Sequence, residues 1–166
     1  MILTIWRHGT AEYASNDRLR ELTTGGREDL GFGSTRFRQA ASLRNIPPVT
    51  TVLHSPWVRT TQTAQIIAIA LHTPEVVSEA ALRPGGALAG VDTLVSSYIE
   101  SDSQQHIVLV SHQPMVSNLV DRYLGDAGLV PPLPPGGLAS MSLDVVAPGC
   151  ARLLFWAFPP EYEVGL

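Results

Sequence analysis

The sequence has 166 residues, which suits one domain with a hydrophobic core and is short for two. Eleven Lys and Arg against fifteen Asp and Glu give a net charge of −4, which argues against a nucleic-acid or anionic-membrane surface, because phosphate backbones bind clustered cations. The single cysteine, Cys150, cannot form an internal disulfide, so we expect a reducing, cytoplasmic compartment. No apolar run is as long as a membrane span, and the N-terminal run has no basic segment before it.

Apolar, strand-like runs alternate with helical patterns along the chain. The predicted strands cover residues 2–6, 49–54, 107–112, 138–146 and 151–158. A first helix should begin near Thr23 or Thr24, either of which can cap it, and end near Leu43. A second should begin just after Pro56 and be well buried, because IIAIA at 66–70 is apolar all round. Apolar residues at helical spacing predict two further helices, over 91–99 and 116–124.

This alternation predicts an α/β fold, because strands joined by crossover helices form a mainly parallel sheet with helices on both faces. We expect a three-layer α/β/α sandwich in which residues 1–166 form a single domain. The last two strands, joined by the short turn APGC at 147–150, should pair as an antiparallel hairpin at the sheet edge. The Pro- and Gly-rich segment 125–137 is expected to be a loop within that domain.

Three of the predicted strands end in polar residues of the same kinds. The first runs into Arg7 and His8, the second is followed by Ser55 and, one helical turn later, by Arg59, and the third ends in His112. In open α/β sheets the carboxyl ends of the strands form the ligand crevice, so these residues should converge. Two guanidinium groups suit a tetrahedral oxyanion, and phosphate is the natural ligand. One histidine there can attack phosphorus while the second stabilises the transferring group.

Four motifs, in this order, resemble the histidine phosphatase superfamily and, within it, the SixA-type phosphohistidine phosphatases. They are RHG at 7–9, R-x-L-T at 20–23, S-P-x-x-R-x-x-Q-T-A at 55–64 and S-H-x-P at 111–114. The likeness extends over nearly the whole chain, and four ordered motifs are far more specific than RHG alone. The resemblance implies a metal-independent phosphatase, without a cofactor, that acts through a phosphohistidine intermediate.

Carried over to this chain, the resemblance implies that His8 is the nucleophile. It also implies which residues hold the phosphoryl group. These are the clamps Arg7 and Arg59, the second histidine His112, and the further substrate-binding residues Arg20 and Gly9. Glu21 stands where SixA relatives often have proline. This departure puts the pose of Arg20 in question.

The sequence contains no clear proton donor. The mutase branch and many sugar phosphatases have a serine and an asparagine where this chain has Ala11 and Ala14, and they have an acidic donor in the region between the motifs that correspond here to S-P-x-x-R and S-H-x-P. Glu79 and Asp92 are the nearest candidates in that region, and neither fits. An imidazole leaving group, with a pKa of about 6.5, tolerates a missing acid better than an alkoxide does. The favoured substrate is therefore phosphohistidine on a signalling or phosphotransfer protein.

Two alternatives stay open: a phosphatase of small phosphate esters, which would need an acid, and a phosphoprotein-binding module without turnover. The short stretch between the Q-T-A helix and the S-H-Q-P motif leaves no room for a lid, so the site should admit a side chain of another protein. His54, His72 and His106 are expected in strand, strand-edge or loop positions outside the site. Glu12 could orient a histidine or face solvent. No histidine or cysteine spacing indicates a metal, and the oligomeric state stays open.

Overall fold

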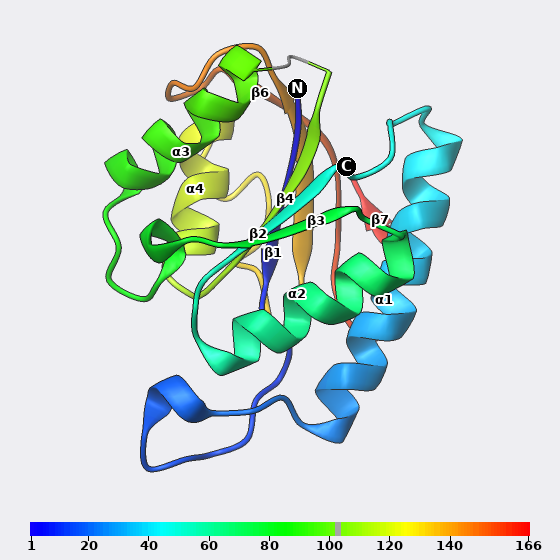
Figure 1. The fold of residues 1–166 in the computed structure, drawn as a ribbon. Coiled ribbons are helices and arrows are strands. Elements are labelled where there is room, and N and C mark those ends of the chain that lie inside the picture. The colour runs from blue at the N-terminus through cyan, green and yellow to red at the C-terminus, as the bar shows by residue number, and fades with distance from the viewer. Residues whose placement is uncertain (102–103) are drawn as a thin grey trace.

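The computed structural model describes residues 1–101 and 104–166, and its seven strands form one sheet in the order β3-β2-β4-β1-β5-β6-β7 (Figure 1). Neighbours from β3 to β1 pair in parallel, and neighbours from β1 to β7 pair antiparallel. The strands are β1 (Ile2–Arg7), β2 (Thr51–His54), β3 (Glu75–Ser78), β4 (His106–Ser111), β5 (Leu138–Leu143), β6 (Ala151–Ala157) and β7 (Val164–Gly165). The helices are α1 (Thr24–Leu43), α2 (Val58–Leu71), α3 (Leu88–Ser101) and α4 (Met115–Leu124), with short 3-10 helices η1 (Asp17–Leu19) and η2 (Ala80–Leu82).

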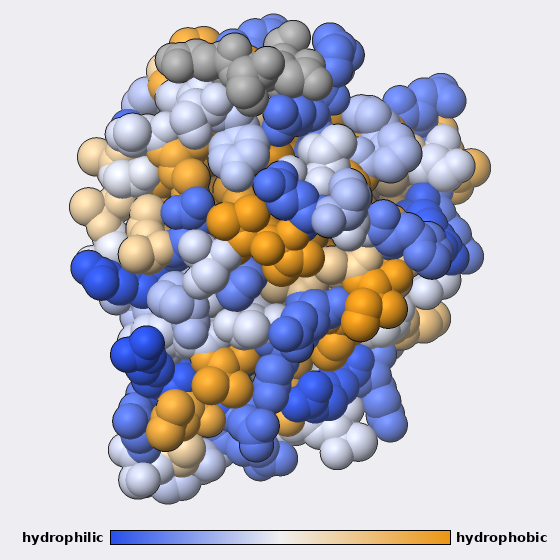
Figure 2. Space-filling view, in the orientation of Figure 1, coloured by the Kyte–Doolittle hydropathy of each residue, from blue (hydrophilic) through white to orange (hydrophobic). Residues whose placement is uncertain are grey.

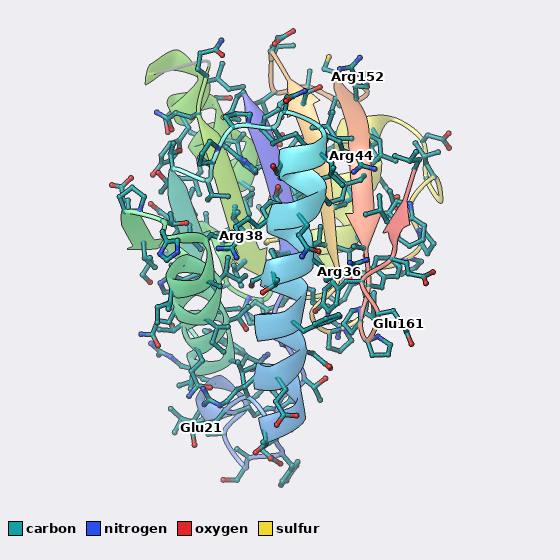
Figure 3. All side chains as sticks on the ribbon, turned by 90° about the vertical axis from the view of Figure 1, so that its right-hand side faces the viewer. Glu21, Arg36, Arg38, Arg44, Arg152 and Glu161 are labelled. Atoms are coloured by element: carbon teal, nitrogen blue, oxygen red, sulfur yellow. The ribbon has the colours of Figure 1, made fainter. Side chains whose placement is uncertain are left out.

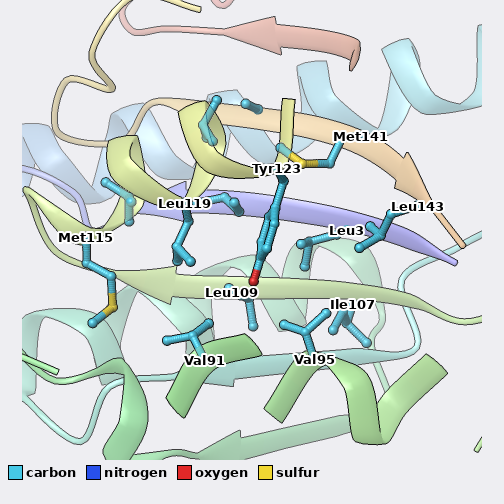
Figure 4. Packing of buried hydrophobic residues seen from close by; sticks show 14 of the residues in the cluster. Leu3, Val91, Val95, Ile107, Leu109, Met115, Leu119, Tyr123, Met141 and Leu143 are labelled. Atoms are coloured by element: carbon cyan, nitrogen blue, oxygen red, sulfur yellow. The ribbon is translucent and has the colours of Figure 1, made fainter. Parts of the chain in front are cut away.

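Helices cover both faces of this sheet. α1 and α2 lie on one face, and α3 and α4 lie on the other (Figure 1). Side chains of β1 alternate between the two cores, because Leu3 packs with α3 and α4 whereas Trp6 packs with α1 and α2. Figure 4 shows the first core, where Leu3 and Leu109 of the sheet lie beside Tyr123 of α4. The expected three-layer α/β/α sandwich is confirmed.

All four predicted helices form, and local signals set their bounds. Thr23 Oγ1 accepts a hydrogen bond from the Gly26 N–H at 2.8 Å, which caps the first turn of α1. α4 ends at Gly125, whose φ of 69° suits glycine. The expectation that α2 is well buried fails at Ile69, which is 77% exposed. The helix covers the sheet with one side only, so its outer side meets solvent.

The sheet differs from the sequence-based expectation at its edges. The apolar patterns do not predict β3, which has four mostly exposed residues at one edge, or β7, which has two at the other. β5 ends at Leu143 rather than at residue 146, so the loop to β6 covers 144–150 and is longer than the APGC turn. The hairpin of β5 and β6 forms as expected, but β7 pairs with β6 and is the edge strand. His106, expected at a loop or strand edge, is fully buried at the start of the interior strand β4.

The outer surface is largely polar and charged. The outer side of α1 carries the exposed residues Arg36 and Arg38, and Arg44 lies over the ring of Phe155 at 5.2 Å (Figure 3). On the face shown in Figure 2, hydrophilic residues surround several separate hydrophobic areas. None of the described helices is both long and apolar enough to cross a bilayer.

Candidate active site

The carboxyl ends of β2, β4 and β1 lie side by side at the end of the sheet next to η1 (Figure 1). Backbone hydrogen bonds extend the strand pairing past these ends: the His8 N–H donates to Ser111 O at 3.1 Å, and the Ser55 N–H donates to Val110 O at 3.1 Å. The residues that follow the three strands therefore meet at one place, as expected of an open α/β sheet. The predicted site residues found there are Arg7, His8, Arg59, His112 and, on the rim, Arg20.

His8 lies at the bottom of the site and is only 7% exposed. Its Nδ1–H donates to the carbonyl oxygen of Gly9 at 2.7 Å, because a carbonyl can only accept. Nε2 is then the atom with the free lone pair, and it accepts a hydrogen bond from Arg59 Nε at 3.2 Å. Burial is the main reason that the pKa of His8 is lowered to about 4; the bond to Gly9 opposes this shift, and the charges of Arg59 and Arg7 add to it. His8 is therefore a neutral imidazole with its lone pair on Nε2.

Arg59, the second residue of α2, is 4% exposed and so is not an ordinary solvated helix cation. Besides its bond to His8, its Nη1 donates to the carbonyl oxygen of Asp17 at 2.7 Å, and its Nη2 lies 3.4 Å from Asp17 Oδ2. The guanidinium carbon also lies 4.9 Å from the centre of the Trp57 ring. These contacts fix the guanidinium beside His8 before any ligand binds.

Arg7 and His112 each present a buried nitrogen atom without a partner. Arg7 Nη1 donates to Leu133 O at 3.0 Å, and His112 Nε2 lies 2.9 Å from Ser55 Oγ. Arg7 Nε and His112 Nδ1, however, find no hydrogen-bond partner among the residues that the structure describes. Because nearly all buried polar atoms in proteins are hydrogen-bonded, the unpaired N–H of Arg7 indicates a ligand that supplies an acceptor oxygen, and His112 Nδ1 can donate to the same ligand when Ser55 Oγ donates to His112 Nε2.

His112 lies close enough to His8 for the two rings to act on one ligand, with their centroids 5.2 Å apart. Burial, followed by the neighbouring charges of His8 and Arg59, lowers the pKa of His112 to about 3. Without a ligand, two protonated imidazoles beside arginine would repel one another, so both rings stay neutral. A phosphoryl dianion between them would favour the protonated form of His112.

Arg20 lies on the rim, where the carboxylate of Asp17 links it to Arg59. Arg20 Nη1 donates to Asp17 Oδ1 at 3.1 Å, and Arg20 Nε donates to Glu12 O at 2.8 Å. Slight burial raises the pKa of Asp17, but the hydrogen bond from Arg20 and the charge of Arg59 outweigh it and hold the pKa below its usual range. The sequence reasoning missed Asp17. Its only signal was its position three residues before Arg20, on η1.

Gly9 uses both of its backbone polar groups inside the protein. Its N–H donates to Thr63 Oγ1 at 3.2 Å, and its carbonyl accepts from His8 Nδ1. A side chain at this position would meet Leu30 Cδ1 at 2.7 Å. Gly9 thus permits close packing of α1 against the loop after β1 and fixes the tautomer of His8, and its predicted contact with substrate stays a prediction.

The other candidate residues lie outside this cluster or turn away from it. Asp92 accepts from Arg122 Nη2 at 2.7 Å and from the Tyr123 hydroxyl at 2.9 Å, which ties α3 to α4. His106 lies at the opposite end of β4 from His112. The exposed residue Glu12 contributes its backbone rather than its carboxylate to Arg20.

Two further candidates have contacts of other kinds. The Glu79 N–H donates to His54 O, and no hydrogen bond joins the Glu79 side chain to the site among the described residues. Glu21, in the place of the family's proline, accepts from Gln62 at 3.0 Å, so Arg20 is positioned by Asp17 and Glu12 instead. Within residues 1–101 and 104–166, no three His, Cys, Asp or Glu side chains form a group that could hold a metal ion.

Comparison with known proteins finds similarity in structure. No family model matches the sequence, and no curated protein matches it either. The protein histidine phosphatase SixA, solved in complex with tungstate, superposes with a TM-score of 0.80 at 25% identity, over 96% of this chain and 97% of that one. The SixA protein of Agrobacterium tumefaciens gives a TM-score of 0.73 at 22% identity, over 95% and 97% of the two chains. A mycobacterial glucosyl-3-phosphoglycerate phosphatase in complex with VO3 gives 0.69 at 16% identity, over 95% and 99%.

These solved structures superpose on this chain over nearly the full length of both chains. The chain therefore has the histidine phosphatase fold. The resemblance to that superfamily, and to its SixA branch, is confirmed at the level of structure.

Proposed function

We propose that this protein is a phosphohistidine phosphatase that acts through a covalent phospho-His8 intermediate and requires no metal. The observation that carries the proposal is the state of His8, a buried and neutral imidazole whose Nδ1–H is held by Gly9 and whose Nε2 lone pair meets Arg59. Nε2 is therefore ready to attack phosphorus. The unpaired nitrogens of Arg7 and His112 supply donors for the phosphoryl oxygens. Tungstate in the similar SixA structure is likewise a tetrahedral oxyanion.

In the first step His8 Nε2 forms a bond to phosphorus. The P–N bond of the substrate breaks, and its electron pair returns to the ring nitrogen of the departing imidazole. The imidazole leaves as a neutral molecule when its other ring nitrogen is already protonated, so this step needs no acid from the enzyme. Arg59 Nε must leave His8 Nε2 as the phosphoryl group arrives, and it then donates to a phosphoryl oxygen.

In the second step a water molecule attacks the phosphorus of phospho-His8. The bond between phosphorus and His8 Nε2 breaks, water supplies the oxygen and protons of the released phosphate, and His8 returns to its neutral state. Arg7, Arg20 and Arg59 hold the negative charge throughout, because guanidinium groups stay protonated. His112 can donate from Nδ1 to the same group.

A preference for P–N over P–O bonds follows from the carboxylates near the site. Asp17 is the carboxylate that contacts the clamp, and two arginines hold it in its ionised form, which makes it a poor proton donor. Asp92 is bound to Arg122 and Tyr123 elsewhere. An alkoxide leaving group would therefore have to depart without the proton donor that it needs. An imidazole whose other ring nitrogen is protonated needs no such donor.

The proposed physiological substrate is phosphohistidine carried by a signalling or phosphotransfer protein. The loop after the RHG motif offers a protein partner two exposed apolar side chains, Tyr13 at 91% and Leu19 at 56% exposure. We also propose that residues 1–166 form one domain without a lid, which is supported by the single sheet that all seven described strands share. The proposed location is the reducing cytoplasm, where the free and exposed Cys150 would stay a thiol.

The test compares phosphate release from a phosphohistidine-labelled protein and from an aryl phosphate ester. Wild type should act far faster on phosphohistidine. His8→Ala should abolish release while keeping affinity for inorganic phosphate within about tenfold. His72→Asn, which changes an exposed histidine at the far end of α2, serves as the matched control and should behave as wild type.

Mass spectrometry of acid-sensitive adducts in a quenched reaction should place the phosphoryl group on the peptide that contains His8. Release by His8→Ala would refute the nucleophile assignment. Faster hydrolysis of the ester would favour a small-ester phosphatase with another acid. Phosphate binding with no turnover of either substrate would identify a phosphoprotein-binding module.

A further inference from the structure

Four side chains of the site form a closed ring of contacts. The ring centroids of His8 and His112 are 5.2 Å apart, and those of His112 and Trp57 are 5.3 Å apart in an edge-to-face arrangement. The guanidinium carbon of Arg59 lies 4.9 Å from the centre of the Trp57 ring, and Arg59 Nε donates to His8 at 3.2 Å. The ring thus joins the nucleophile, the second histidine and a clamp to one aromatic residue that the mechanism above does not use.

Trp57 is the member of this ring that reaches solvent. His8, His112 and Arg59 are 7%, 2% and 4% exposed, whereas Trp57 is half-buried. Its indole N–H makes no hydrogen bond to any residue in the described part of the chain. Trp57 therefore offers part of its aromatic surface, and a free donor, at the mouth of the site.

The direction of the leaving group follows from this difference in exposure. Phosphorus must approach His8 Nε2, and His8 is only 7% exposed, whereas Trp57 is half-buried. A substrate histidine belongs to another protein, so its imidazole has to extend from phosphorus toward the open side. Trp57 is the aromatic residue in this ring of contacts that reaches solvent. An imidazole and an indole attract each other through stacked or edge-to-face contact, and a protonated imidazole adds a cation–π contact.

We propose that Trp57 binds the imidazole ring of the substrate and makes the enzyme selective for phosphoryl groups carried on a ring nitrogen. The inference rests on the proposed function, because it concerns the leaving group of that reaction. Arg59 covers one part of the indole, and the substrate ring takes the part that faces solvent. The bond changes are those of the first step: His8 Nε2 bonds to phosphorus, and the electron pair of the P–N bond stays with the departing ring.

A simpler role for Trp57 would be to position Arg59 and His112, and two probes separate the roles. Phosphoimidazole and phosphoramidate both contain a P–N bond to the same phosphoryl group, but only phosphoimidazole carries a ring. Loss of a positioning residue would slow both reactions equally. Loss of a ring-binding residue would slow the reaction of phosphoimidazole alone.

The experiment measures kcat/KM for both compounds in wild type, Trp57→Phe and Trp57→Leu. We expect Trp57→Leu to lose at least about tenfold on phosphoimidazole and less than about threefold on phosphoramidate, with Trp57→Phe closer to wild type on both. Equal losses on the two compounds, or equal behaviour of the Phe and Leu variants, would overturn the inference. If wild type hydrolyses neither compound nor a phosphohistidine protein, the proposed function itself fails, and that result differs from both outcomes above.

Discussion

Acid should destabilise this protein through histidines that the fold keeps neutral, and His106 gives the clearest case because it lies away from the active site. It is fully buried at the start of β4. Its Nδ1–H donates to Pro47 O at 2.8 Å, so its Nε2 accepts from Thr4 Oγ1 at 2.9 Å. Thr4 Oγ1 in turn lies 2.6 Å from Ser140 Oγ. A second proton on His106 would break the bond from Thr4 and place a charge in the core.

The size and sign of the effect follow from the pKa of His106. Burial lowers it from 6.5 to about 4, against the opposing effect of the bond to Pro47. Because the folded pKa lies below the unfolded value, the unfolded chain binds more protons between these two pH values. The contribution to stability is complete above about pH 6.5 and is lost as the pH falls toward 4. Between pH 7 and pH 5 it amounts to about 2 kcal/mol of unfolding free energy.

Urea unfolding of wild type and His106→Gln at pH 7 and pH 5 tests this reasoning. The variant should be less stable than wild type at pH 7, but its loss between the two pH values should be smaller by about 2 kcal/mol. His8 and His112, whose pKa values are lowered in the same direction, should leave part of the acid sensitivity in both proteins. His72→Asn controls for removal of a histidine from the surface. An identical loss in wild type and His106→Gln would show that His106 is not held neutral in the folded state.

Four further substitutions test packing and charge interactions in the fold and at the site. Gly26→Ala should lower the free energy of unfolding in urea by about 1–3 kcal/mol, because its Cβ would lie 2.4 Å from Thr10 O. Gly25→Ala has nothing within 4 Å of its Cβ and should raise the free energy of unfolding by roughly 0.5–1 kcal/mol. A change of the same sign in both variants would contradict the packing argument. Asp92→Asn should cost about 1–3 kcal/mol of stability but leave kcat unchanged, and a large loss of kcat would make Asp92 the missing acid. Asp17→Asn removes a negative charge beside Arg20 and Arg59, so it should tighten the binding of inorganic phosphate on the order of fivefold, as measured by calorimetry. Unchanged or weaker binding would show that Asp17 acts mainly by orienting the two arginines.

The sequence was most informative where chemistry and regular structure coincide. His8 and His112 each directly follow a buried strand, and Arg59 lies in the first turn of the helix that follows another buried strand. Because the ends of such strands meet at one edge of the sheet, their convergence could be predicted without coordinates. The long amphipathic helices and the cap at Thr23 depend on local signals and were predicted for the same reason.

The features that the sequence did not reveal depend on contacts between distant segments. β3 and β7 are short edge strands whose exposed residues carry no apolar pattern. Asp17 contacts Arg59 only because the loop after β1 packs against the start of α2. No sequence pattern predicts a contact between two residues that are 42 positions apart. The burial of His106 results from its neighbours Thr4 and Pro47, which belong to other segments. Such residues become visible only when the packing of the sheet is known.

The hydrogen bond from Arg59 to His8 has a consequence for the resting protein. The lone pair that would attack phosphorus is covered by a cation until an oxyanion draws that cation away. A neutral electrophile offers Arg59 no negative charge, so the hydrogen bond from Arg59 would keep His8 Nε2 blocked. A phosphoryl group would instead attract Arg59 to its own oxygen atoms, and this contact would free the lone pair of His8 Nε2. In the proposed mechanism the reactivity of His8 would therefore depend on the charge of the ligand, and this dependence would protect a neutral histidine from modification by uncharged electrophiles.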